Sequence, residues 1–175
     1  MVSQIKVDSV LESTSAAGVT IDGVLLKDSK LASGTGNVLQ VVTATLTPET
    51  NIQNTSYQDT GLTATITPSA TSSKILVVVS YNVRVNRTNY SDINGHYILL
   101  RGSTEIDKRF HLLRGSSAHN ENVQAAAITH LDSPNTTSAV TYKTQAKCGT
   151  TDSNGTISVS YGGTEDSMHL IEIGG

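Results

Sequence analysis

The chain has 175 residues, a formal net charge of −3 and only 15% charged residues, while Ser and Thr supply about a quarter of it. This length allows one domain with a buried core plus a small appendage. Lys and Arg are scattered, which excludes nucleic-acid binding, and the longest apolar runs, such as residues 75–79, are too short for membrane insertion.

The first 36 residues form a segment of their own. Apolar and polar residues alternate around Val19, Ile21 and Val24, and Gly18 and Gly23 separate the pieces. Such alternation predicts strands, but two or three very short strands cannot form an independent core. Their apolar side chains must pack on the following domain, a neighbouring copy or a docking partner, and we favour neighbouring copies. The start of the sequence lacks a signal-peptide pattern, so we expect synthesis in a cytosol.

From residue 38 onward, strand patterns alternate with turn residues. The predicted strands cover residues 38–47, 61–67, 74–85, 95–101, 105–113, 123–131, 139–147, 156–161 and 168–173. Pro48, Pro68 and Pro134 all fall between strands, where a missing N–H does no harm. Residues 122–130 would also tolerate a helix. Nine short strands at this spacing predict an all-β sandwich or barrel.

The strand at residues 74–85 is apolar on both faces over its first half. One face carries Ile75, Val77, Val79, Tyr81, Val83 and Val85. Leu76 and Val78 point to the other face. A two-layer sandwich covers one face, and a contact between three chains would cover the second. We therefore hypothesise that this strand lines a threefold axis, with Ile75, Val77, Val79 and Val83 as packing residues.

Metal and cofactor chemistry is not indicated. The single cysteine, Cys148, excludes an intrachain disulfide. None of the five histidines forms a tight ligand pair; His96 and His111 could meet across a hairpin, but a paired strand surface explains them. Residues 152–155 resemble half of a calcium loop and are interpreted as an Asn-Gly turn. We expect no metal and no cofactor.

Catalysis is not indicated either. Gly102-Ser103 and Gly115-Ser116 lack the pattern of a nucleophile elbow. Carboxylates for glycoside cleavage exist at Glu165-Asp166, Glu105, Asp107 and Asp132, but acidic loop residues are usually solvated. We expect that the protein is not an enzyme.

Loop tips are the remaining candidates for a binding surface. One predicted loop combines charge, amide and ring in Arg87, Asn89, Tyr90 and Asp92. An aromatic ring stacks on the apolar face of a sugar while amides bond its hydroxyls, and loops on a stable scaffold commonly carry function. These four residues are the predicted ligand-binding residues.

Three parts of the sequence resemble virion fibre proteins of tailed bacteriophages, especially the small fibres of marine and cyanobacterial phages. They are GVTIDGVLLKDSKL at 18–31, SSKILVVVSYNVRV at 72–85 with HYILLRGSTEI at 96–106, and LDSPNTTSAVTYKTQAK at 131–147 with MHLIEIGG at 168–175. The resemblance covers nearly half of the chain and implies a homotrimer. It also implies an N-terminal β stalk or virion adaptor at residues 1–36. Residues 37–175 would form a jelly-roll-like β-sandwich head, similar in outline to the tumour-necrosis-factor and C1q heads.

The function expected from this resemblance is that of a structural fibre of the virion, made in the host cytoplasm. The tail fibre would recognise a host-surface glycan through its head and contact other virion proteins through its N-terminal segment. A capsid decoration or head fibre without a specific ligand is the alternative, and a carbohydrate-active enzyme is a third. Because the chain has almost no shaft, tail and capsid locations both stay open.

Overall fold

The computed structural model describes residues 19–21, 24–27, 30–31, 36–87, 93–115, 121–149 and 155–175. Within them the regular structure consists of antiparallel strands and one short 3₁₀ turn, η1, at Tyr161–Gly163. The prediction of an all-β chain is confirmed. In chain order, the strands of the main body are β4 (Val38–Leu46), β5 (Thr50–Ile52), β6 (Gln58–Ile66), β7 (Lys74–Arg87), β8 (Ile93–Arg101), β9 (Thr104–Gly115), β10 (Glu121–Asp132), β11 (Val140–Cys148), β12 (Gly155–Val159) and β13 (Asp166–Ile173).

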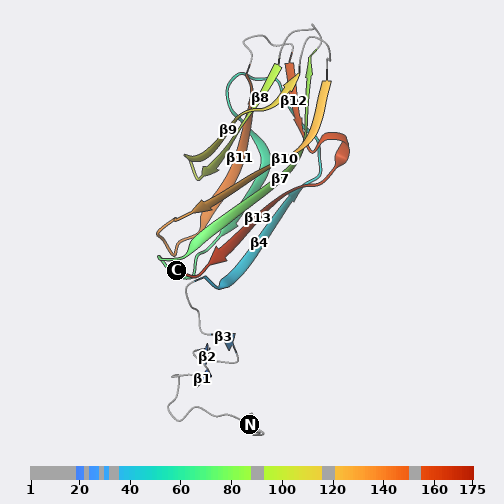
Figure 1. The fold of residues 1–175 in the computed structure, drawn as a ribbon. Helices are drawn as coiled ribbons and strands as arrows, with labels where there is room; N and C mark the ends of the chain where they lie inside the picture. The colour runs from blue at the N-terminus through green and yellow to red at the C-terminus, as the bar shows by residue number, and fades with distance from the viewer. Residues whose placement is uncertain are drawn as a thin grey trace, which may run out of the picture.

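A separate small sheet precedes the main body. It consists of β1 (Val19–Ile21), β2 (Val24–Lys27) and β3 (Lys30–Leu31), paired in that order. Figure 1 shows this sheet below the end of the main body at which β4 begins. It lies inside the segment that the sequence separates from the rest of the chain.

The main body is a sandwich of two antiparallel sheets (Figure 1). In the first sheet, the long strand β7 pairs with β10 on one side. On its other side it pairs with β13 over one half and with β12 over the other half, and β4 and β5 continue the sheet outward. The second sheet has the order β6-β11-β8-β9. Both sheets are therefore four strands wide.

The break between β12 and β13 is held by a buried carboxylate. Asp166 accepts hydrogen bonds from the backbone N–H of Asn82 and from that of Ser160, both at 2.7 Å. The Asn82 N–H lies on β7 opposite the break, and the Ser160 N–H lies directly after β12, where the chain leaves the edge of β7. Burial raises the pKa of Asp166 above its ordinary value, although the two amide donors oppose this effect. The carboxylate thus replaces ladder hydrogen bonds that the break removes.

The core lies between the sheets and follows the period-two alternation of the strands. Alternate side chains of β7, from Ile75 to Val85, are buried and face their counterparts on β11 and β8, such as Tyr142 and Leu99. On the inner side of the first sheet, β13 contributes Met168.

Polar groups close the side of the sandwich where the two edge strands β9 and β10 meet. Asp132 accepts hydrogen bonds from Arg101 at 2.9 Å and from the Tyr142 hydroxyl at 2.7 Å. Asp107 lies 2.9 Å from Arg109 and 3.4 Å from a ring nitrogen of His130. Burial, together with the bond to Asp132, raises the pKa of the Tyr142 hydroxyl. These contacts tie the first sheet to the second.

Each of the nine strands predicted between residues 38 and 173 corresponds to an observed strand. The segment that would tolerate a helix, residues 122–130, belongs to β10 and pairs along its whole length with β7. Sequence reasoning missed β5, a strand of three residues, because so short a piece carries no alternation to detect.

Candidate functional site

The two ends of the sandwich differ in the strand ends that they contain. At one end lie the ends of the strands that flank residues 88–92, 116–120 and 150–154. Register shows this directly, since Arg87 pairs with Gly155 and Ile93 pairs with Gly115. At the opposite end, β4 begins beside the last residues of the chain, where the Gly36 N–H donates to Gly174 O.

Of the four predicted ligand-binding residues, one belongs to the described part of the chain. Arg87 is the last residue of β7, and its backbone position is fixed by pairing with β12. Asn89, Tyr90 and Asp92 lie outside the described residues. The binding role of these four residues therefore stays a prediction.

The four predicted packing residues require a correction. Ile75, Val77, Val79 and Val83 are each 0% exposed and belong to the core of a single chain. The alternation along β7 turns them toward the second sheet, so each chain covers them by itself. Any contact between copies must use other side chains, and on the opposite face of the same strand Leu76 and Val78 are partly exposed.

The open face of the first sheet carries a block of uncharged side chains. Register aligns its residues in three rows across β10, β7, β13 and β4. The rows are Leu131-Leu76-Ile171-Val41, then Thr129-Val78-His169-Thr43, then Ala127-Ser80-Ser167-Thr45. We call these twelve residues the apolar outer face.

Exposure on this face is highest at its two sides. Val41 is 57% exposed and Leu131 is 51% exposed, and they are the outermost members of one wholly apolar row. Val38, which lies next to that row, is 62% exposed. In the second row, the Thr43 hydroxyl lies 3.0 Å from Nδ1 of His169. The twelve residues include no Asp, Glu, Lys or Arg.

The outer face of the second sheet is different, and we call it the charged outer face. It includes the outward residues of β6, β11, β8 and β9, with ion pairs Lys143–Asp59 at 3.0 Å and Lys108–Glu105 at 2.7 Å. Ile98 and Leu100 also point outward here, yet they are only 4% and 7% exposed. Register places Ile98 between Gln145 and Lys108. Long side chains of this kind cover apolar neighbours with their stems while their polar ends stay in water.

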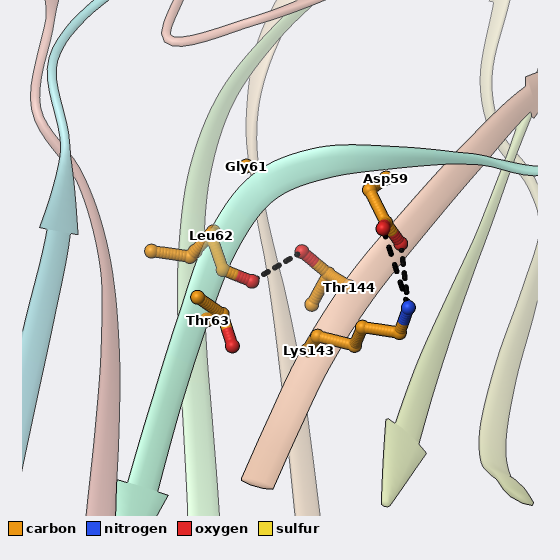
Figure 2. A pocket seen from close by; sticks show the side chains of 6 residues that line it. All are labelled: Asp59, Gly61, Leu62, Thr63, Lys143 and Thr144. Atoms are coloured by element: carbon orange, nitrogen blue, oxygen red, sulfur yellow. Dashed lines mark hydrogen bonds and ion pairs between the residues drawn. The ribbon is translucent and has the colours of Figure 1, made fainter. Parts of the chain in front are cut away.

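A shallow hollow of about 180 Å³ lies on this second sheet, between β6 and β11 (Figure 2). It forms where the pairing of the two strands shifts, and Gly61 there has a φ of +96°, which favours glycine. Figure 2 shows the Lys143 ammonium against the Asp59 carboxylate at its rim. Hydrogen bonds from Gln145 and Lys143 lower the pKa of Asp59. The hollow's one carboxylate is thus engaged by its own neighbours.

The sequence candidates for metal binding and catalysis are spread over the molecule. Among the described residues, no group of three or more His, Cys, Asp and Glu side chains has a geometry that could hold a metal ion. A register shift in the β8–β9 pairing puts His96 opposite the stretch that contains His111, whose side chain lies outside the description. Cys148 is buried, with its thiol near two backbone carbonyls.

The carboxylates considered for glycoside cleavage have separate surroundings. Asp107 and Asp132 belong to the polar groups that close the side of the sandwich where β9 and β10 meet, and Glu105 pairs with Lys108. Asp166 is buried beside two backbone amides, while its neighbour Glu165 is exposed.

No protein-family model matches the sequence, and a search of curated proteins finds no match. Within the described part of the chain, no helix has the length and apolar character that spanning a membrane requires.

Proposed function

We propose that the chain is a virion fibre protein of a tailed bacteriophage. In this proposal three copies assemble, residues 1–36 attach the assembly to other virion proteins, and residues 37–175 form a head that binds a glycan on the host surface. The sequence resemblance supplies the class of protein. The observation that carries the proposal is the division between the two ends of the sandwich.

That division fits a fibre head. Chain from the N-terminal segment arrives at the end where β4 starts, and the intervals at 88–92, 116–120 and 150–154 are held at the other end. An attachment segment and a set of recognition loops at opposite ends of a rigid body is the arrangement that a receptor-binding tip needs. Arg87, the one predicted glycan ligand in the described part of the chain, ends β7 at that end of the sandwich, where it pairs with Gly155.

The strand order supports a jelly-roll head. When β4 and β5 are counted as one strand and β12 and β13 as another, each sheet has four strands, in the orders β10-β7-β12/β13-β4/β5 and β9-β8-β11-β6. Jelly rolls are double sheets of eight strands and occur in viral capsid and lectin domains. A similar outline in trimeric heads is what the resemblance implies.

Binding is tested with the full chain on a glycan array and on whole host cells. We expect saturable binding that Tyr90→Ala weakens at least tenfold, because loss of the ring removes stacking on the sugar. Ser103→Ala is the matched control, since the turn after β8 lies at the opposite end of the sandwich. Unchanged binding by Tyr90→Ala would remove this loop from the proposal.

Two further results would replace the proposal. Imaging of phage particles with an antibody against the head should label the virion, and a labelled virion without saturable adsorption to glycans or cells would establish the decoration alternative. Release of reducing sugar from host polysaccharide would establish a carbohydrate-active enzyme instead.

A further inference from the structure

We propose that the apolar outer face is where copies of this chain meet, with the three faces turned toward a common axis that runs along the strands. The inference rests on the proposed function, because it assigns the contact surface of the assembly that the function requires. The proposed contact between copies uses outward residues of β10, β7, β13 and β4, in place of the core residues of β7 that were predicted from the sequence.

The face has the size of a functional surface patch. Four strands about 4.8 Å apart and three rows about 6.8 Å apart cover about 400 Å², and six of the twelve residues there contribute apolar side chains. The largest exposed apolar patch on a typical soluble monomer covers about 300–600 Å² and is often functional. Val41 and Leu131 are more than half exposed on this patch.

The uncharged side chains of the face favour another copy of the same face as the binding partner. Because the twelve residues carry no Asp, Glu, Lys or Arg, they offer no attraction to a charged ligand or a charged protein surface. Identical faces that meet also bring identical charges together, and the three rows carry none; Lys74 lies in the next row, aligned with Ile173 and Val38. Six of the twelve are Ala, Ser or Thr, among them Ala127, Ser80 and Thr45, and these small side chains permit close approach.

Geometry allows three copies around one axis. The outermost strands of a sheet four strands wide lie about 14 Å apart, and the edge strands of neighbouring copies must stay at least about 5 Å apart, so the axis of three such sheets lies about 7 Å from each. Two stacked sheets lie about 10 Å apart, so each fills about 5 Å with side chains. Side chains of β7 and β13, among them Leu76, Val78 and Ile171, would therefore occupy most of the space between each sheet and the axis.

The same arrangement brings the N-terminal segments together. Val38, the first residue of β4, lies directly beside the apolar row on the side of the sandwich where the chain arrives. An axis parallel to the strands places the three copies of Val38 at one end and the three copies of Arg87 at the other. The face is thus continuous with the segment whose apolar residues are predicted to pack on neighbouring copies.

A pair of cysteines tests the arrangement directly. In the threefold ring, Val41 of one copy adjoins Leu131 of the next, since they occupy opposite sides of the same row. Within one chain, they are separated by three strand spacings, about 14 Å, whereas a disulfide needs Cα atoms within about 7 Å. The native Cys148 is buried and does not compete.

The full chain carrying Val41→Cys and Leu131→Cys is oxidised and run on a non-reducing gel. We expect a covalent species of three chains that reduction returns to single chains. The matched control is Thr63→Cys with Glu105→Cys, which occupy the two outermost strands in one row of the charged outer face and should stay as single chains.

Single chains or a covalent pair of chains from the Val41→Cys and Leu131→Cys variant would overturn the threefold contact. Light scattering of the unmodified chain separates this failure from failure of the proposed function. A three-chain mass without cross-linking rejects the face but keeps the fibre, whereas a single-chain mass rejects the assembly itself.

Discussion

The two outer faces of the sandwich both consist of the outward-pointing residues that alternate with inward-pointing ones along the strands, but they differ in how far their apolar side chains are covered. On the charged outer face, Ile98 and Leu100 point outward but are almost fully covered beside long polar side chains. On the apolar outer face, Leu131 and Val41 have no such cover and stay half exposed. One face is thus covered within a single chain, while the other leaves apolar side chains exposed, and we propose that another copy covers them.

The largest effect is expected from a charge at the centre of the apolar outer face. Val78→Glu would bring three carboxylates close to one axis, and like charges at an interface cost several kcal/mol. We expect at least a hundredfold weaker association, measured by sedimentation equilibrium, with the strand content of each chain unchanged. Thr141→Glu, on the exposed side of β11, is the control and should leave association as it was. Equal association of the two variants would contradict the comparison.

The next largest effect is a difference in unfolding free energy between truncating a covered leucine and truncating an exposed one. Leu100→Ala should lower the free energy of unfolding by about 2–5 kcal/mol, because a covered side chain leaves a cavity. Leu131→Ala should lower it by less than about 1 kcal/mol in single chains, because half of that side chain already contacts water. Denaturant unfolding on the Val78→Glu background measures both without assembly. Equal losses would show that the two faces are covered alike.

The smallest effect concerns the ion pair on the charged outer face. The hydrogen bonds from Gln145 and Lys143 lower the pKa of Asp59, so its contribution is present above about pH 4 and is lost as the pH falls through the folded value. In Lys143→Ala, the pKa of Asp59 should rise toward its ordinary range, as followed by NMR titration. The pair is exposed and screened, so unfolding free energy at neutral pH should fall by less than about 1 kcal/mol. A larger loss of unfolding free energy would show that the Lys143–Asp59 pair stabilises the fold itself and does not only cover apolar neighbours on the charged outer face.

Much of the fold could be predicted because each long strand carries its own signal. Alternation along β7 already separates Ile75 and Val77 from Leu76 and Val78, and the structure confirms that the first pair is inward. The sequence does not show which face a single chain covers by itself. For this reason the residues predicted to pack between copies belong to the inward side.

The parts that could not be predicted depend on residues distant in sequence. The apolar row joins Val41, Leu76, Leu131 and Ile171, and only the register of four strands brings them into line. The carboxylate of Asp166 is likewise an ordinary loop acid in the sequence, and its role at the break between β12 and β13 requires the amides of Asn82 and Ser160. Local patterns do not encode such pairings.

The mass of the unmodified full chain in solution tests the central claim most directly. Light scattering at micromolar concentration should give three times the chain mass of 18.4 kDa, because copies cover one another's apolar outer face. A mass of 18.4 kDa that stays constant as the concentration rises would contradict the account.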